Sequence, residues 1–143
     1  MPRLKLTLPT KIHFTTTIPV RITDINYGNH LGNDSLVSIV HEARVKWLAS
    51  KKYTELNMAG ASLIMADLAV EYKGESFYGD VLTINIYVGE ITTVSFELFY
   101  EINTIRNERN FLIAKAKTGM VCFNYKSKKV IPIPNEVEFF LKH

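Results

Sequence analysis

The chain has 143 residues, the size of one ordinary domain with a single hydrophobic core. Its composition, 47% hydrophobic and 22% charged, excludes a disordered tail, a collagen repeat and a disulfide scaffold. No stretch approaches the roughly 20 apolar residues of a membrane span. The single cysteine, Cys122, has no internal partner and the first residues lack a signal-peptide core, so we expect a cytoplasmic protein. The net charge of +3 is too dispersed to predict a nucleic-acid or membrane partner, yet it suits a small phosphorylated ligand.

The first half of the chain predicts a strand, a loop and a long helix. Residues 12–22 are rich in Thr, Ile and Val and predict a strand. Pro19 indicates that this strand lies at an edge of the sheet or that it ends there. Residues 24–33 form a loop rich in Gly and Asn, and a helix follows near Asn33 or Asp34, both good N-caps. Its apolar stripe consists of Leu36, Ile39, Val40, Ala43 and Trp47. Four cations toward its C-terminal end suit the helix dipole: Arg44, Lys46, Lys51 and Lys52.

The second half alternates with the period of strands. Leu82, Ile84, Ile86 and Val88 face one way along residues 81–88, while the polar residues between them face the other. The other predicted strands are residues 65–72, 96–102 and 111–125, with Gly119 expected at a bulge of the last. Short polar segments at 89–93 and 104–110 predict hairpins, and residues 135–142 predict a short helix.

One helix followed by a run of antiparallel strands indicates an α+β class rather than a doubly wound sheet. No linker or internal repeat divides the chain, so residues 1–143 are expected to form one domain. A single long helix against a curved sheet is the simplest way to bury both apolar faces.

The loop at 24–33 carries the most suggestive chemistry. A helix start offers unpaired N–H groups to a carbonyl oxygen that becomes an oxyanion. The carboxylate of Asp24, a few residues upstream, can activate water or attack the carbonyl itself. On spacing alone a simpler interpretation is favoured, in which Asp24, Asn26, Asn29 and Asn33 only form turns and caps. The four histidines do not fall at zinc-site spacings, and no phosphate loop or G-x-S-x-G motif is present, so no metal is expected.

Several short motifs together resemble a known family. They are Arg21–Asn33, with Thr-Asp and then Gly-Asn-His-Leu-Gly-Asn; His41–Leu48, with Glu-Ala-Arg; Val70–Tyr72; Tyr78–Leu82; Ala114–Phe123; and Ile131–Pro134. In this order, from about residue 12 to 137, they resemble the 4-hydroxybenzoyl-CoA thioesterase family of the hot-dog fold. The resemblance implies a long central helix wrapped by an antiparallel sheet of about five strands.

The resemblance also implies roles for individual residues. Asp24 matches the catalytic carboxylate, as base or nucleophile, and the backbone N–H groups of Leu31, Gly32 and Asn33 match the oxyanion donors. The residues expected to position the substrate are His30, Asn26 and Tyr27. Gly32 stands where the family has the first Asn of an Asn-Asn pair. The implied substrate is an acyl-CoA or an acyl-carrier protein, no cofactor is needed, and the active site lies at the subunit interface of a homodimer or homotetramer.

Other residues have a simpler explanation. Glu42 is a second candidate carboxylate, but it also fits as the helical partner of Lys46 four residues on. Asp67 interrupts an apolar strand and is either paired in the interior or directed into a pocket, and residues 78–80 fit a turn before a strand. Residues that could line an acyl tunnel, although such side chains are usually core, are Tyr27, Phe77, Met58 and Met65.

Three other functions remain open at this stage. A non-catalytic module would bind acyl-CoA or acyl-carrier protein without releasing thiol. A hot-dog hydratase would carry its His after an Asn-Pro pair, which this sequence lacks. A purely structural dimer would show no effect of acyl-CoA on its melting temperature.

Overall fold

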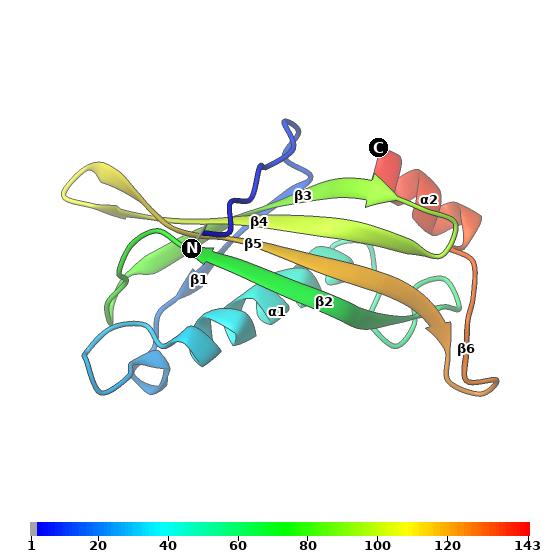
Figure 1. The fold of residues 1–143 in the computed structure, drawn as a ribbon, viewed down its shortest axis with the longest axis horizontal. Helices are drawn as coiled ribbons and strands as arrows, with labels where there is room; N and C mark the ends of the chain where they lie inside the picture. Colours follow the sequence, from blue (N-terminus) through cyan, green and yellow to red (C-terminus); the bar gives the residue numbers. More distant parts are fainter. Residues whose placement is uncertain (1–2) are drawn as a thin grey trace.

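In the computed structural model, which describes residues 3–143, one antiparallel sheet curves around one long helix (Figure 1). The strands are β1 (Phe14–Pro19), β2 (Ser62–Tyr72), β3 (Val81–Ile91), β4 (Ser95–Arg106), β5 (Arg109–Asn124) and β6 (Lys129–Val130). The helices are α1 (Asn33–Ala49), α2 (Asn135–Lys142) and the short 3-10 turn η1 (Ile22–Asp24). The α+β class is confirmed, and the sheet has six strands in place of the expected five because of the two-residue β6.

The strands are ordered β1-β3-β4-β5-β2, with β6 added to the end of β5, and every neighbouring pair is antiparallel. The meander β3-β4-β5 predicted from the alternating pattern is confirmed. β1 lies at one edge, as Pro19 indicated, and β2 lies at the other. β4 and β5 are joined by a two-residue turn, Asn107–Glu108, in which both residues have positive φ as a type I′ hairpin requires.

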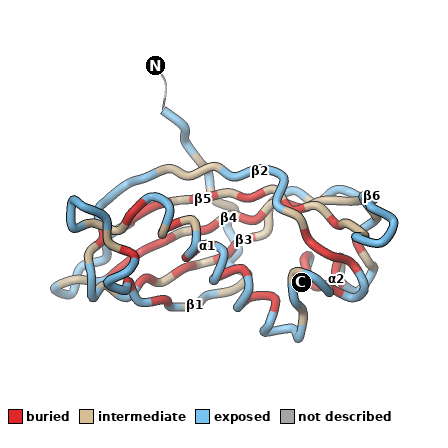
Figure 2. The backbone as a smooth tube through the Cα atoms, turned by 90° about the horizontal axis from the view of Figure 1, so that it is seen from below, coloured by how far each residue is buried: buried red, intermediate tan, exposed pale blue. Residues whose placement is uncertain are grey.

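The core lies between α1 and the concave face of the sheet. The predicted apolar stripe of α1 is buried, together with Leu48. The sheet contributes alternate residues, among them Ile84 and Ile86 of β3 and Leu98 and Ile102 of β4. Figure 2 shows these buried segments concentrated where α1 meets β3, β4 and β5. Burial of these side chains stabilises the fold by roughly 1.5–3 kcal/mol each before chain entropy is subtracted.

One local expectation was wrong: the N-cap of α1 is Gly32, with extended φ and ψ, and Asn33 is already helical. The register shift expected at Gly119 is present, because the pairing of β2 with β5 shifts between Met65 and Asp67, opposite Met120 and Gly119. The extra residue is not in β5, whose alternate residues remain buried from Ala114 to Cys122. The irregular residue opposite it is Ala66 of β2, between Met65 and Asp67, and the irregular residue of β5 itself is Ile113.

The glycine at 119 serves this bulge in another way. Its N–H donates to Asp67 Oδ1 at 2.8 Å, and a Cβ added at Gly119 would lie 2.7 Å from the same oxygen. Asp67 also accepts a hydrogen bond from Lys117 Nζ at 3.1 Å. Asp67 is therefore paired, as one of its two interpretations held, but it is paired on the exposed face of the sheet rather than in the interior.

Candidate active site

Asp24 lies at the end of η1, directly before the polar loop. Its carboxylate accepts hydrogen bonds from the backbone N–H of Arg21 at 2.8 Å and from the Arg21 guanidinium at 3.3 and 3.4 Å. The Asp24 side chain is only 6% exposed, whereas that of Arg21 is 65% exposed. A buried carboxylate that accepts several hydrogen bonds, some of them from a charged partner, is held in one position.

The loop closes on itself through its backbone. Gly32 N–H donates to the Asp24 carbonyl at 2.9 Å, and Asn26 N–H donates to the His30 carbonyl at 2.8 Å. The Asn26 side-chain oxygen accepts from the N–H groups of Gly28 and His30. Asn26 is therefore a turn former here, in line with the simpler interpretation of the loop. The Gly32 bond fixes Asp24 beside the start of α1.

The helix start carries free hydrogen-bond donors. Within the described part of the chain, the N–H groups of Asn33, Asp34 and Ser35 have no acceptor. The N–H groups of Leu31 and Gly32 are already used, because they donate to the carbonyls of Ser76 and Asp24. Of the expected oxyanion donors, only Asn33 is therefore free in this conformation.

A cavity of about 180 Å³ borders this helix start. Four of the predicted site residues line it: Asn26, His30, Leu31 and Asn33. Asp24 and Gly32 do not line it, and the Tyr27 side chain is fully exposed at the loop tip.

The far wall of this cavity was not anticipated from the sequence. It comes from the end of β2 and the segment after it: Tyr72, Gly74, Glu75 and Ser76. His30 Nε2 lies 3.4 Å from Glu75 Oε2, and the His30 ring packs edge-on against Phe77. The only available signal was the polar cluster at residues 73–76, which indicates a loop but not its position opposite His30.

The remaining candidates have structural roles. Glu42 pairs with Lys46 at 3.6 Å on the exposed face of α1. Asp80 ends the predicted turn, where its carboxylate accepts from the Ser76 hydroxyl and the Phe77 N–H. Met58 is fully buried core, whereas Met65 is exposed on β2.

The described residues hold neither a cluster of metal ligands nor a helix that could span a membrane. Across residues 3–143, no three His, Cys, Asp or Glu side chains converge as metal ligands. None of the described helices is long and apolar enough to cross a membrane.

The fold defines the class of protein: a long helix wrapped by an antiparallel sheet is the hot-dog fold. A 1,4-dihydroxy-2-naphthoyl-CoA thioesterase from Synechocystis has the same fold, with a TM-score of 0.80 over 90% of this chain and 95% of that chain, at 22% identity. A 4-hydroxybenzoyl-CoA thioesterase also has this fold, in a structure with Asn in place of an Asp and with 4-hydroxybenzoyl-CoA bound. Its TM-score is 0.80 over 90% of this chain and 97% of that one, at 14% identity.

The sequence identifies the family. Residues 20–141 match the model of the thioesterase-like superfamily. A 1,4-dihydroxy-2-naphthoyl-CoA hydrolase from Acaryochloris marina is 28% identical over 126 residues, which are 85% of this chain and 90% of that protein. An Aquifex aeolicus protein, provisionally named an esterase, is 30% identical over 103 residues, 71% of this chain and 76% of that protein. The chain therefore belongs to the thioesterase-like superfamily, and it is a thioester hydrolase.

Proposed function

We propose that this protein hydrolyses acyl-CoA thioesters at the start of α1, with Asp24 as the catalytic carboxylate. The observation that carries the proposal is the bond from Gly32 N–H to the Asp24 carbonyl, which holds a buried carboxylate beside a helix start with free N–H groups. The named activities of the Acaryochloris and Synechocystis proteins, both on a CoA thioester, support CoA as the carrier.

The thioester carbonyl oxygen would accept a hydrogen bond from the free N–H of Asn33, with those of Asp34 and Ser35 adjacent to it. Such donors stabilise the oxyanion that forms when the carbonyl carbon is attacked. As a base, Asp24 takes a proton from the attacking water; as a nucleophile, it forms an acyl anhydride that water then cleaves. In both cases the C–S bond breaks, CoA leaves as the thiol and the acid is released.

The other loop residues have supporting roles in this proposal. The His30 and Glu75 pair would contact the substrate from the cavity wall, and Asn26 holds the loop through its side-chain oxygen. Leu31 and Gly32 shape the loop rather than donate. Tyr27, exposed at the tip, would meet the substrate or a second subunit.

We further propose that two chains pair through β2, in a homodimer or in a tetramer built from such dimers. Residues of β2 that pair with buried β5 residues must face the helix side of the sheet. Three of those residues are nevertheless exposed: Met65 by 42%, Leu68 by 36% and Tyr72 by 49%. A second copy would cover this row, and Tyr72 would bring that copy to the wall of the active-site cavity.

A thiol-release assay tests the proposed activity. The panel contains 4-hydroxybenzoyl-CoA, 1,4-dihydroxy-2-naphthoyl-CoA and aliphatic acyl-CoAs of several chain lengths. We expect release from at least one substrate and a fall in kcat of about 100-fold or more in Asp24→Asn. The matched variant Glu42→Gln should keep its rate, because Glu42 is paired on the solvent face of α1.

Three outcomes contradict the proposal. Tight acyl-CoA binding without thiol release would indicate the non-catalytic module. Full activity in a folded Asp24→Asn protein, with activity lost in Glu42→Gln, would move the catalytic role to the helix. An unchanged melting temperature with every acyl-CoA would leave only a structural dimer.

A further inference from the structure

Residues 75–80 lie in the connection between β2 and β3 and form part of the far wall of the active-site cavity. A backbone hydrogen bond of 2.7 Å joins them to the loop at 24–33, because Leu31 N–H donates to the Ser76 carbonyl. Ser76 is only 1% exposed, so water does not compete for this carbonyl. The free N–H of Asn33, the proposed oxyanion donor, lies two residues after Leu31. The position of this donor therefore depends on where the connecting segment lies.

Arg106, the last residue of β4, binds this segment from outside the cavity. Its Nη2–H donates to the Glu75 carbonyl at 2.8 Å, and its Nε lies 3.4 Å from Asp80 Oδ1. The Asp80 carboxylate in turn accepts from the Ser76 hydroxyl at 2.8 Å and from the Phe77 N–H at 3.0 Å. One guanidinium therefore holds both ends of the segment.

The guanidinium of Arg106 also contacts two aromatic rings. Its Cζ lies 5.1 Å from the ring centroid of Phe77 and 4.6 Å from that of Phe111. The Phe77 ring packs edge-on against the ring of His30, with centroids 5.6 Å apart. A planar, delocalised cation suits this position because it can lie on aromatic faces while it donates hydrogen bonds in its own plane. Lysine would not reproduce these contacts.

A bulge in β5 brings the hairpin of β4 and β5 to this segment (Figure 1). The extra residue is Ile113, whose carbonyl accepts from the N–H groups of both Lys73 and Gly74, directly ahead of the segment. A Cβ added at Gly74 would lie 3.0 Å from a carbonyl oxygen of β5, which leaves little room for a side chain. The hairpin and the segment are therefore packed as one unit beside the active-site cavity.

We propose that Arg106 is a positioning residue for thioester hydrolysis. It fixes the segment at 75–80, and the bond between Ser76 and Leu31 transmits this position to the oxyanion donor. The inference rests on the proposed reaction at the start of α1. Arg106 acts through these groups, since it does not line the active-site cavity. Oxyanion donors act on the transition state more than on the bound substrate, so a displaced donor lowers kcat more than it raises KM.

Steady-state kinetics of thiol release test the effect on catalysis. Arg106→Met removes every donor, and we expect kcat to fall about tenfold while KM changes less than about threefold. Arg106→Lys should recover little of this loss, because an ammonium cannot lie on the rings and reach both Glu75 and Asp80. Arg109→Met is the matched control, since Arg109 is exposed and lies opposite Arg106 in the same hairpin. This control should keep the wild-type rate.

Amide hydrogen exchange separates positioning from general stability. The Leu31 N–H reports on the bond to Ser76, whereas the N–H of Ile84, in the middle of the sheet, reports on global unfolding. In Arg106→Met we expect exchange at Leu31 to accelerate about tenfold more than exchange at Ile84. Arg109→Met should leave both rates unchanged.

A milder variant replaces Arg106→Met if that protein does not fold. Phe111→Leu removes one ring from the guanidinium and leaves its hydrogen bonds in place. The value of kcat should then fall about twofold to fivefold, and exchange at Leu31 should accelerate by a similar factor.

The inference is overturned if a folded Arg106→Met protein keeps kcat within about twofold of the wild type. It is also overturned if Leu31 and Ile84 accelerate equally, which would indicate a loss of global stability only. Full recovery in Arg106→Lys, or an equal loss in Arg109→Met, would reject the specific contacts of Arg106.

Failure of the proposed function gives a different result. A wild-type protein that releases no thiol rejects that function and, with it, the catalytic part of this inference. The exchange rates need no substrate, so they still decide whether Arg106 holds Leu31 in place. Conversely, loss of the rate in Asp24→Asn with an unchanged rate in Arg106→Met rejects this inference alone.

Discussion

Arg44 is a buried cation at a position of the apolar stripe. Its side chain is 6% exposed, donates from Nε to Glu55 Oε2 at 2.8 Å and from Nη1 to the Tyr100 hydroxyl at 3.2 Å. The Tyr100 hydroxyl in turn bonds Thr118 at 2.8 Å. The sequence favoured Arg44 as a cation near the helix end, but the structure uses it to join α1 to the following loop and to two strands.

Replacing Arg44 by Met tests this network. The change leaves the Glu55 carboxylate partly buried without its guanidinium, and we expect it to lower the free energy of unfolding by about 3 kcal/mol. The double variant Arg44→Met with Glu55→Gln should recover part of that loss, because no uncompensated charge remains. Urea unfolding of the wild type, the single variants Arg44→Met and Glu55→Gln and the double variant measures the coupling, and additive losses would contradict it.

At the scale of elements, β2 differs from the other edge strand. β1 has six residues, three of which are consecutive threonines, and ends at a proline, whereas β2 has eleven residues and an apolar row that α1 leaves exposed. Long exposed apolar edges are avoided in monomers because they pair with other chains. This contrast is the physical basis for proposing β2, rather than β1, as the pairing strand.

A lysine in the exposed row should prevent pairing. Leu68→Lys places a charge on the helix side of β2 and should shift the mass measured by light scattering from dimer to monomer. Val81→Lys is the matched control, since Val81 is exposed to a comparable degree but starts an internal strand. A wild-type protein that is monomeric at high concentration would reject the proposed pairing.

The helices and strands could be predicted because the apolar residues of each one repeat with the period of that structure, about 3.6 residues in a helix and 2 in a strand. The stripe of α1 and the alternation of β3, β4 and β5 are local patterns, and the structure reproduces them. Contacts at the two ends of α1 could not be predicted in this way. Glu75 meets His30, and His13 meets Trp47 and Phe140, only because the sheet brings distant segments together. The family resemblance marked Asp24, but it gave no sign that its carboxylate pairs with Arg21.

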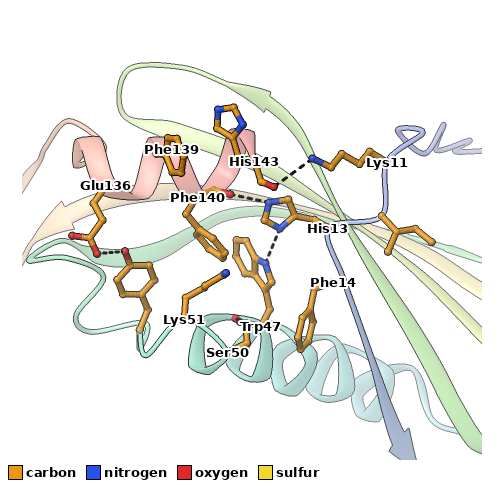
Figure 3. Close-up of a pocket in the computed structure, with 12 residues that line it drawn as sticks. Lys11, His13, Phe14, Trp47, Ser50, Lys51, Glu136, Phe139, Phe140 and His143 are labelled. Atoms are coloured by element: carbon orange, nitrogen blue, oxygen red, sulfur yellow. Dashed lines mark hydrogen bonds between the residues drawn. The ribbon is translucent and has the colours of Figure 1, made fainter.

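For the whole molecule, His13 links stability to pH. It lies at the end of α1 opposite the active-site cavity, where Trp47 Nε1–H donates to His13 Nδ1 and His13 Nε2–H donates to the Phe140 carbonyl (Figure 3). Burial lowers the pKa of His13 below its ordinary value of 6.5. The hydrogen bond to the Phe140 carbonyl raises this pKa, whereas the positive charges of Lys11 and Lys51 lower it further.

The other titratable groups around the cavity that His13 lines are Glu136, Tyr53 and His143. Below about pH 6.5 the unfolded chain takes up this proton before the folded one, so stability falls as the pH falls and levels off below the folded pKa.

The variant His13→Gln isolates this effect. A Gln amide can accept from Trp47 and donate to the Phe140 carbonyl, as His13 does, but it does not titrate. Melting temperatures between about pH 7.5 and pH 5 should decline in the wild type and remain flatter in the variant. Burial raises the pKa of Glu55, but its hydrogen bonds to Arg44 and His41 outweigh this effect and hold the pKa below its ordinary value of 4.5. The stability that this carboxylate contributes is therefore lost only below about pH 4.5. Equal slopes for both proteins would contradict the role of His13.

The exposed row on β2 has a kinetic consequence. If the second copy covers Tyr72 and completes the wall of the active-site cavity, a separated subunit is a poor catalyst. Specific activity would then rise with enzyme concentration toward a plateau, and the concentration at half-maximal activity would report the dissociation constant of the pair. In Leu68→Lys the same curve would move to higher concentration, so that dilution, rather than substrate, would limit the rate.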